Sequence, residues 1–165
     1  MGMFVSEPHW LKIVSEQEKM LCFTSFTQED ALKIGLLVIE LAKNKYHGSA
    51  AVRIIADDTV WFAYKMPGTS LENDWWMTRK INTSKLTGVS SLRAYLEIEE
   101  GFRKESWRAR EGSFVACGGC IPVLMREGEP FAYIAVSGLR HEEDHQLAAD
   151  AIAAHLKMDI RSILG

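Results

Sequence analysis

Two cysteines and two histidines of this chain stand at spacings that could support metal or redox chemistry. Cys117 and Cys120 enclose a Gly-Gly pair, and His141 and His145 lie four residues apart in the segment HEEDH. Together they could close a tetrahedral zinc site, although the segment between the two pairs is longer than the usual roughly 12 to 15 residues. Alone, the cysteines could form a redox pair, and the histidines with Glu142 match the H-E-x-x-H motif of zinc proteases.

The surrounding sequence disfavours each of these three sites. Gly138 predicts that a helix begins near His141, which places this histidine at a frayed helix end, and no third metal ligand is obvious. A redox cysteine needs a helix N-terminus to lower its pKa, whereas the pair here is followed by the strand-like residues 121–124. We therefore predict no metal site and keep the four side chains as weak candidates. The cysteines are expected to be reduced and semi-buried beside a tight glycine turn.

Length and composition indicate one compact domain covering residues 1–165. The hydrophobic fraction of 47% is enough to fold without a metal or a disulfide. With 19 basic and 22 acidic residues the net charge is -3, which argues against nucleic-acid and anionic-membrane partners. The longest apolar run, IGLLVIELA, is too short to cross a bilayer and no leader pattern is seen, so we predict a cytoplasmic protein.

Hydrophobic periodicity predicts an α+β domain built on an antiparallel sheet. Helices are expected over residues 6–20, 27–41, 73–86, 90–102 and 141–157. Strands are expected over 50–56 and 59–66, joined by the turn Asp57-Asp58, and again over 114–125 and 130–138. The order of helices and strands favours this class over a parallel α/β sheet.

The segment MPGTSLENDWWMTRKINT, residues 66–83, combines capping groups, cations, amides and large rings. More capping side chains crowd its start than one helix needs, and Arg79 and Lys80 follow Trp75 and Trp76 closely. Such a helix could bind a planar or carboxylate-bearing ligand. Equally, it could be a surface helix whose tryptophans lie in the core or at a subunit contact.

This segment, with SSLRAYLEIEEG, GGCIPV and AVSGLRHEEDHQLAADAI, resembles the GlcG-like and HbpS-like family, also labelled haem-degrading-domain-like. The similarity runs from the second helix to the last and includes the MPGTS…ND.W..RK.NT signature of one branch. The resemblance implies a profilin-like fold, with a central antiparallel β-sheet flanked by helices, and a homo-oligomer, either a dimer or an assembly of dimers. It implies no single reaction. The branch pattern matches Asp144 and His145, but it does not require Cys117, Cys120 or His141.

Three glycine-bearing loops could meet in one pocket for an anion. They are the loop after the hairpin, the Gly118-Gly119 turn and the Ser137-Gly138 entrance to the last helix. Glycines let backbone N–H groups approach a ligand, and two helix N-termini would add partial positive charge. The predicted ligand-binding residues are Met66, Pro67, Gly68, Thr69, Asn73, Trp76, Arg79, Lys80, Asn82, Gly118, Gly119, Ser137, Gly138 and His145.

These patterns leave three functions open. We favour an oligomeric cytoplasmic protein that binds a small anionic, haem-like or corrinoid-like molecule; any haem would be non-covalent, because the C-x-x-C-H motif is absent. The second is a structural or adaptor protein that acts through its oligomer surface. The third is a metal-assisted or hydrolytic enzyme in which Asp144 orients His145 through a hydrogen bond. Alternatively, Asp144 only caps its helix and His145 packs against a neighbouring subunit.

Overall fold

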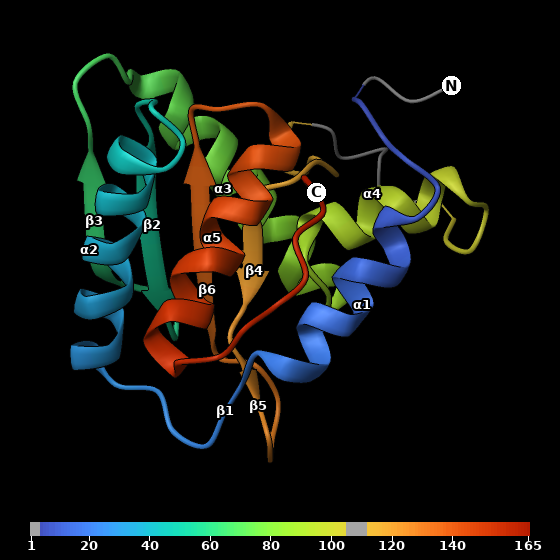
Figure 1. Cartoon of the computed structure of the whole chain (residues 1–165), viewed down its shortest axis with the longest axis horizontal. Helices are drawn as coiled ribbons and strands as arrows, with labels where there is room; N and C mark the ends of the chain where they lie inside the picture. Colours follow the sequence, from blue (N-terminus) through green and yellow to red (C-terminus); the bar gives the residue numbers. More distant parts are fainter. Residues whose placement is uncertain (1–3, 105–111) are drawn as a thin grey trace.

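The computed structural model describes residues 4–104 and 112–165, and it shows a mixed domain with helices on both faces of one sheet (Figure 1). The four strands of this sheet lie in the order β3-β2-β6-β4, and each pair of neighbours is antiparallel. They are β2 (Ala51–Ala56), β3 (Thr59–Lys65), β4 (Cys120–Pro122) and β6 (Ala132–Ser137). The predicted α+β class and antiparallel sheet are therefore confirmed.

The helices form two layers around the sheet and one group beside it. Helices α2 (Gln28–Asn44) and α5 (His141–Leu156) cover one face, and α3 (Leu71–Thr87) covers the other (Figure 1). Helices α1 (Trp10–Met20) and α4 (Ser91–Glu99) pack together near β4. All five predicted helices are present. Strand β1 (Cys22–Phe23) and its parallel pairing with β5 (Leu124–Met125) were not predicted, because two-residue strands are too short to show alternation.

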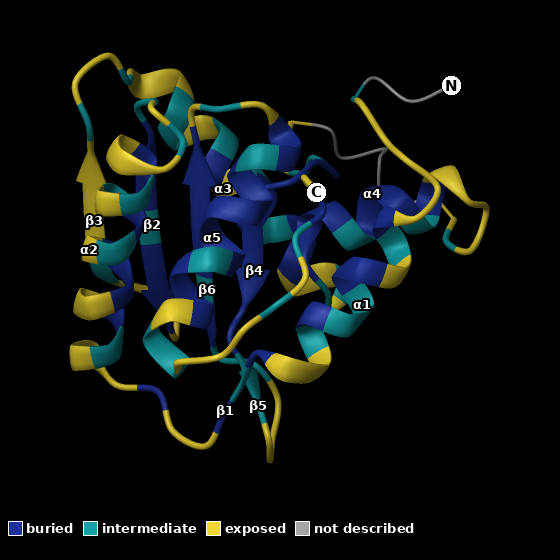
Figure 2. Cartoon of the chain, viewed as in Figure 1, coloured by how far each residue is buried: buried dark blue, intermediate teal, exposed yellow. Residues whose placement is uncertain are grey.

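The alternation of side chains in β2 explains why both faces of the sheet are covered. Val52 and Ile54 belong to the core under α2 and α5, whereas Ala51 and Ile55 join Met77 in the core under α3. Successive side chains of a strand point to opposite faces, so a strand that is apolar on both needs two covering layers. The edge strand β3 is largely exposed (Figure 2).

Local capping chemistry sets the helix ends. Thr27 and Asp30 form a capping box at the start of α2, and Gly88, with φ of 77°, ends α3 in the left-handed conformation. Helix α3 starts two residues before the predicted Asn73. Its N-cap is Ser70, and the Asn73 side chain accepts from the Ser70 N–H to complete the capping box.

The strand predicted over residues 114–125 is wrong in its first half. Only Cys120–Pro122 and Leu124–Met125 are paired as strands, whereas residues 114–119 run along α3. Thr83 holds this segment, since its hydroxyl donates to the Val115 carbonyl at 2.7 Å and accepts from the Val115 N–H at 3.0 Å. Gly119 has φ of 138°, a conformation that interrupts a strand.

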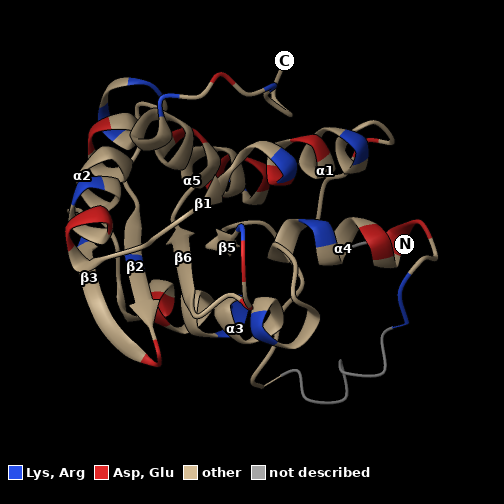
Figure 3. Cartoon of the chain, turned by 90° about the horizontal axis from the view of Figure 1, so that it is seen from below, with Lys and Arg blue, Asp and Glu red and all other residues tan. Residues whose placement is uncertain are grey.

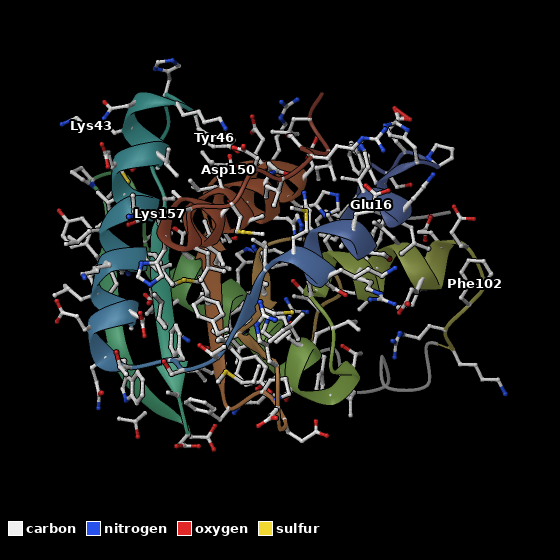
Figure 4. The ribbon with its side chains drawn as sticks, turned by 60° about the horizontal axis from the view of Figure 1, so that its bottom comes forward. Glu16, Lys43, Tyr46, Phe102, Asp150 and Lys157 are labelled. Atoms are coloured by element: carbon white, nitrogen blue, oxygen red, sulfur yellow. The ribbon has the colours of Figure 1, made fainter. Side chains whose placement is uncertain are left out.

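A polar contact joins the segment after α2 to α5. The Tyr46 hydroxyl donates to Asp150 Oδ2 at 2.6 Å, and Figure 4 shows the two side chains facing each other. Burial, followed by the hydrogen bond to Asp150, raises the pKa of the Tyr46 phenol well above its ordinary value.

Acidic and basic residues are mixed along α1, α2 and α4 in the view of Figure 3. Within residues 4–104 and 112–165, no helix has the length and apolar character needed to cross a membrane.

Substitution of Gly35 in α2 would test how closely this helix packs on the sheet. A methyl group at position 35 would overlap the Phe62 ring of β3. Gly35→Ala should therefore lower the free energy of unfolding by about 1–3 kcal/mol, despite the higher helix propensity of alanine. Urea denaturation would measure this loss. The double variant with Phe62→Val should recover part of it, and Lys33→Ala on the exposed side of α2 should change stability by less than about 0.5 kcal/mol. A neutral or stabilising Gly35→Ala would contradict the packing.

Candidate functional site

A pocket of about 180 Å³ lies where α3 meets the junction of β6 and α5; we call it the Lys80 pocket. It combines two aromatic rings with several polar groups. Its lining residues are Phe4, Trp76, Lys80, Cys117, Ser137, Leu139, His141 and Asp144. Part of α3, Cys117 beside the Gly-Gly turn and the β6–α5 junction therefore come together, whereas the predicted loop of residues 66–69 is not in the lining.

A buried ion pair forms part of the wall of the Lys80 pocket. Lys80 Nζ lies 3.1 Å from Asp144 Oδ2, and the exposed fractions of the two side chains are only 3% and 4%. Lys80 Nζ also donates to the Val136 carbonyl at 2.9 Å, while Asp144 Oδ1 accepts from the Leu139 N–H at 2.9 Å. An ammonium has three N–H donors, so one remains for a ligand.

Burial shifts the pKa values of both partners. It raises the pKa of Asp144 to about 6, although the nearby Lys80 charge and the Leu139 N–H act to lower it. Burial acts to lower the pKa of Lys80, but the attraction of Asp144, with smaller contributions, outweighs it and leaves the pKa raised. At neutral pH the pair is therefore an ammonium and a carboxylate, and the carboxylate is close to its titration range.

The two glycines of the turn make room for protein groups. A methyl group at Gly119 would lie 2.6 Å from Lys80 Nζ, and a methyl group at Gly118 would overlap the His141 carbonyl. The Gly118 N–H donates to His141 Nδ1 at 3.0 Å. The prediction that this turn offers a free backbone donor at Gly118 is therefore wrong, because that donor is already paired inside the protein.

His141 is buried and held at both ring nitrogens, which corrects the prediction of a frayed helix end. Because Nδ1 accepts from the Gly118 N–H, the ring proton sits on Nε2, which donates to the Val5 carbonyl at 2.7 Å. Burial lowers the pKa of His141 below its ordinary value. This histidine connects the start of α5 to the N-terminal segment.

His145 faces away from Asp144, so the predicted hydrogen bond between them is wrong. Consecutive residues of a helix point in different directions, and His145 Nε2 instead lies 2.9 Å from Gln17 Oε1 of α1. His145 is 2% exposed within its own chain, and burial lowers its pKa to about 3. The geometry thus gives no support to a catalytic pair of Asp144 and His145, and His145 does not line the pocket.

Arg79 and Asn82 hold a neighbouring segment and do not line the Lys80 pocket. The Arg79 guanidinium stacks 4.1 Å from the Trp75 ring centre and donates to the Phe114 carbonyl at 3.1 Å. The Asn82 amide donates to the Ser113 carbonyl at 2.8 Å. Residues on one helix diverge around its axis, so the sequence cluster RKIN cannot act as one unit.

The loop of residues 66–69 is not part of the lining of the Lys80 pocket. The Ser49 hydroxyl donates to the Pro67 carbonyl of this loop, and the backbone of Ser49 packs directly against Gly138. The Asn73 amide donates to Ser137 Oγ at 3.0 Å and so links the start of α3 to the pocket wall. Of the three predicted loops, two border the pocket and the third supports it.

The weak metal candidates do not assemble into one site. Cys117 lines the pocket, whereas Cys120 is fully buried, and its N–H is bonded to the Ser91 hydroxyl at 3.0 Å. Burial raises the pKa of Cys117 to about 11 and that of Cys120 to about 12. Among residues 4–104 and 112–165, no three His, Cys, Asp or Glu side chains are placed to hold a metal ion.

Sequence reasoning missed two lining residues, Phe4 and Leu139. The Phe4 ring lies 4.9 Å from the His141 ring and 5.7 Å from the Tyr95 ring, both centre to centre. An isolated aromatic residue before a polar segment carries no periodic signal. Leu139 is likewise a single apolar residue between Gly138 and Arg140, with no pattern that would mark it as part of a site.

The contribution of the Lys80–Asp144 pair to stability can be tested by substitution. Asp144→Asn keeps an oxygen for the Leu139 N–H but leaves the buried ammonium without its counter-charge, so we expect a loss of about 3–5 kcal/mol in unfolding free energy. Adding Lys80→Met should restore part of it. Chemical denaturation of the four variants in the cycle gives the coupling energy. The exposed pair Lys85 and Asp58 is the matched control, with an expected effect below about 1 kcal/mol. A similarly small effect at Asp144 would contradict the buried pair.

Comparison with known proteins supports the resemblance read from the motifs. Residues 26–153 match the family model "Haem degrading protein HbpS-like". A UPF0303 protein of Mesorhizobium japonicum is 32% identical, with 93% of each chain covered. A UPF0303 protein of Streptomyces coelicolor is also 32% identical, with 84% of this chain and 89% of its own covered.

Solved structures share the fold. The Ybr137w protein is 25% identical with a TM-score of 0.79, and 89% of each chain is covered. HbpS is 21% identical with a TM-score of 0.64, covering 81% of this chain and 92% of its own. The PduOC:heme complex is 20% identical with a TM-score of 0.68, covering 84% and 98%. The matched family model and the curated relatives together show that this chain belongs to the HbpS-like family.

Proposed function

We propose that this protein binds a small anionic ligand, represented here by a carboxylate, in the Lys80 pocket. The observation that carries the proposal is a buried ammonium that lines a pocket and has one N–H donor beyond its two protein acceptors. A buried cation with a spare donor favours an anion, because charge-assisted hydrogen bonds are stronger than neutral ones.

The electrostatic balance of the pocket supports an anion despite the presence of Asp144. This carboxylate lies in the first turn of α5 and accepts the Leu139 N–H, so backbone donors and the helix dipole compensate part of its charge. The ammonium of Lys80 has no comparable second anion among its described contacts, since its other acceptor is the neutral Val136 carbonyl. The pocket therefore retains some positive character.

The walls favour a small planar ligand. Phe4 and Trp76 supply aromatic surface, and the Ser137 hydroxyl, which accepts from Asn73, can still donate its own hydrogen. The volume of about 180 Å³ is below the roughly 300–1,000 Å³ of pockets that hold drug-sized ligands. A benzoate-sized acid suits this space better than a tetrapyrrole.

Haem-related binding is the second candidate, favoured by the family description and by a structural neighbour solved as a haem complex. The Lys80 pocket in this conformation does not fit haem. It is small, both nitrogens of His141 are occupied, and His145 lies outside it. The other three histidines are also outside its lining. A Soret band that appears at one equivalent of added haemin would support this candidate.

Self-association and a cytoplasmic location are further parts of the proposal. Exposed apolar side chains occur on β3 and on the first turns of α3, at Val60, Tyr64, Leu71 and Trp75. Such residues suit a contact between copies of the chain, in a dimer or an assembly of dimers. The adaptor function would use the same surface. Analytical ultracentrifugation of the double variant Leu71→Ser with Trp75→Ser would test whether this surface mediates self-association.

Benzoate binding tests the anion site directly. Calorimetric titration should show one site per chain in the unaltered protein. The double variant Lys80→Met with Asp144→Asn, which removes both charges, should bind at least about tenfold more weakly. Lys85→Met on the same helix is the control and should bind normally, because Lys85 lies outside the pocket. Equal affinity in the double variant would overturn the proposal.

Anion affinity should rise as the pH falls through about 6. Asp144, whose pKa is about 6, repels the ligand only while it is ionised. A bound anion raises this pKa further, so binding takes up a proton. If that further rise is about one unit, affinity should increase roughly sixfold between pH 7.5 and 5.5. Benzoate stays ionised over this range, and Asp144→Asn should flatten the profile. An affinity that falls on acidification would contradict the role of Asp144.

A further inference from the structure

We infer that the N-terminal segment, residues 4–7, is a removable lid on the Lys80 pocket, and that Phe4 limits the size of the ligand admitted. The inference rests on the proposed function only where it speaks of a ligand. The opening of the lid itself is a property of the chain alone and can be measured without one.

The attachments of the lid are concentrated at Phe4. Its ring lines the pocket, next to the rings of His141 and Tyr95. The Phe4 N–H donates to the Tyr95 hydroxyl at 3.1 Å, and this hydroxyl donates back to the Phe4 carbonyl at 2.7 Å. Tyr95 belongs to α4 and is itself buried, so it offers a fixed anchor.

A hydrogen bond from His141 also holds the lid to α5. His141 Nε2 donates to the Val5 carbonyl, while the Val5 side chain is 57% exposed. The side chains of residues 5–9 are all exposed, so they bury little apolar surface. The Trp10 N–H is bonded to the Glu7 carbonyl at 3.1 Å, which marks the start of α1 and the natural hinge of the lid.

The lid segment differs from the part of the pocket wall that is formed by helices. Trp76 and Lys80 are on α3, and His141 and Asp144 are on α5, so they move only with the packed core. Phe4 stands on an irregular segment, and its ring packs against the core around Tyr95, whereas the side chains of residues 5–9 are exposed; a segment held mainly at one residue can open locally at low free-energy cost. When Phe4 leaves, Cys117 and Lys80 become reachable, and the space limit of about 180 Å³ is removed on that side.

Alkylation of Cys117 by iodoacetamide measures the opening. Cys22→Ser removes the half-buried thiol, and mass spectrometry of peptides separates modification at Cys117 from that at Cys120. Phe4→Ala should accelerate modification of Cys117 at least about tenfold, equivalent to about 1.4 kcal/mol of lost lid contacts. In a chain that lacks residues 1–5, modification of Cys117 should be accelerated to a similar extent.

Val5→Ala is the matched control, because it keeps the latching carbonyl and alters an exposed side chain. Its alkylation rate should equal that of the Cys22→Ser background. Unchanged rates in both Phe4→Ala and the shortened chain would overturn the lid. Acceleration in Val5→Ala equal to that in Phe4→Ala would also overturn it, since the effect would then not depend on the Phe4 ring.

Amide hydrogen exchange on the unaltered chain provides a test that needs no variant. The Phe4 N–H should exchange through local opening, well before core amides such as that of Ile134 in β6. If the Phe4 N–H exchanges only on global unfolding, the lid does not exist.

Ligand size links the lid to the anion site. The ratio of affinities for 1-naphthoate and benzoate should rise about tenfold in Phe4→Ala, because the larger acid needs the space that the ring fills. If neither acid binds but Cys117 alkylation accelerates, the lid stands and the anion proposal falls. If both acids bind with an unchanged ratio, Phe4 does not set ligand size and this part of the inference falls.

Discussion

The buried pair of Lys80 and Asp144 is the constraint that organises this end of the molecule. Two charges removed from water are tolerated only when each is paired and its remaining hydrogen-bonding groups are satisfied. That requirement brings α3 against the β6–α5 junction, aligns the Val136 carbonyl with the ammonium and directs the Leu139 N–H to the carboxylate. It also requires a glycine at position 119, where a side chain would occupy the space of the ammonium.

The first turn of α5 distributes its polar side chains among different parts of the fold. Asp144 pairs with α3, His141 contacts the Gly-Gly turn and the N-terminal segment, and His145 contacts Gln17 of α1. Each group is engaged in holding the structure. Burial lowers the pKa values of both histidines, so both imidazoles are neutral at neutral pH.

Part of the site could be predicted from the sequence. Trp76, Lys80 and Ser137, which were predicted to bind a ligand, line the Lys80 pocket, whereas residues 66–69 and the three glycines at 118, 119 and 138 are not in its lining. The roles of the glycines were misjudged, because the sequence shows that a side chain is missing but does not show what fills the space. The partner of Asp144 was also misjudged, since adjacency in sequence is not adjacency on a helix surface.

The sequence alone determined the family, the fold class, the five helices and the antiparallel sheet, because these depend on periodicity, capping and turn residues that act over short distances. Only the tertiary structure decided which of Arg79 and Lys80 enters the pocket, which nitrogen of His141 carries the proton, and that Phe4 lines the pocket. These features depend on contacts between segments far apart in the chain, where a rotation of one helix by a single residue exchanges a buried charge for an exposed one.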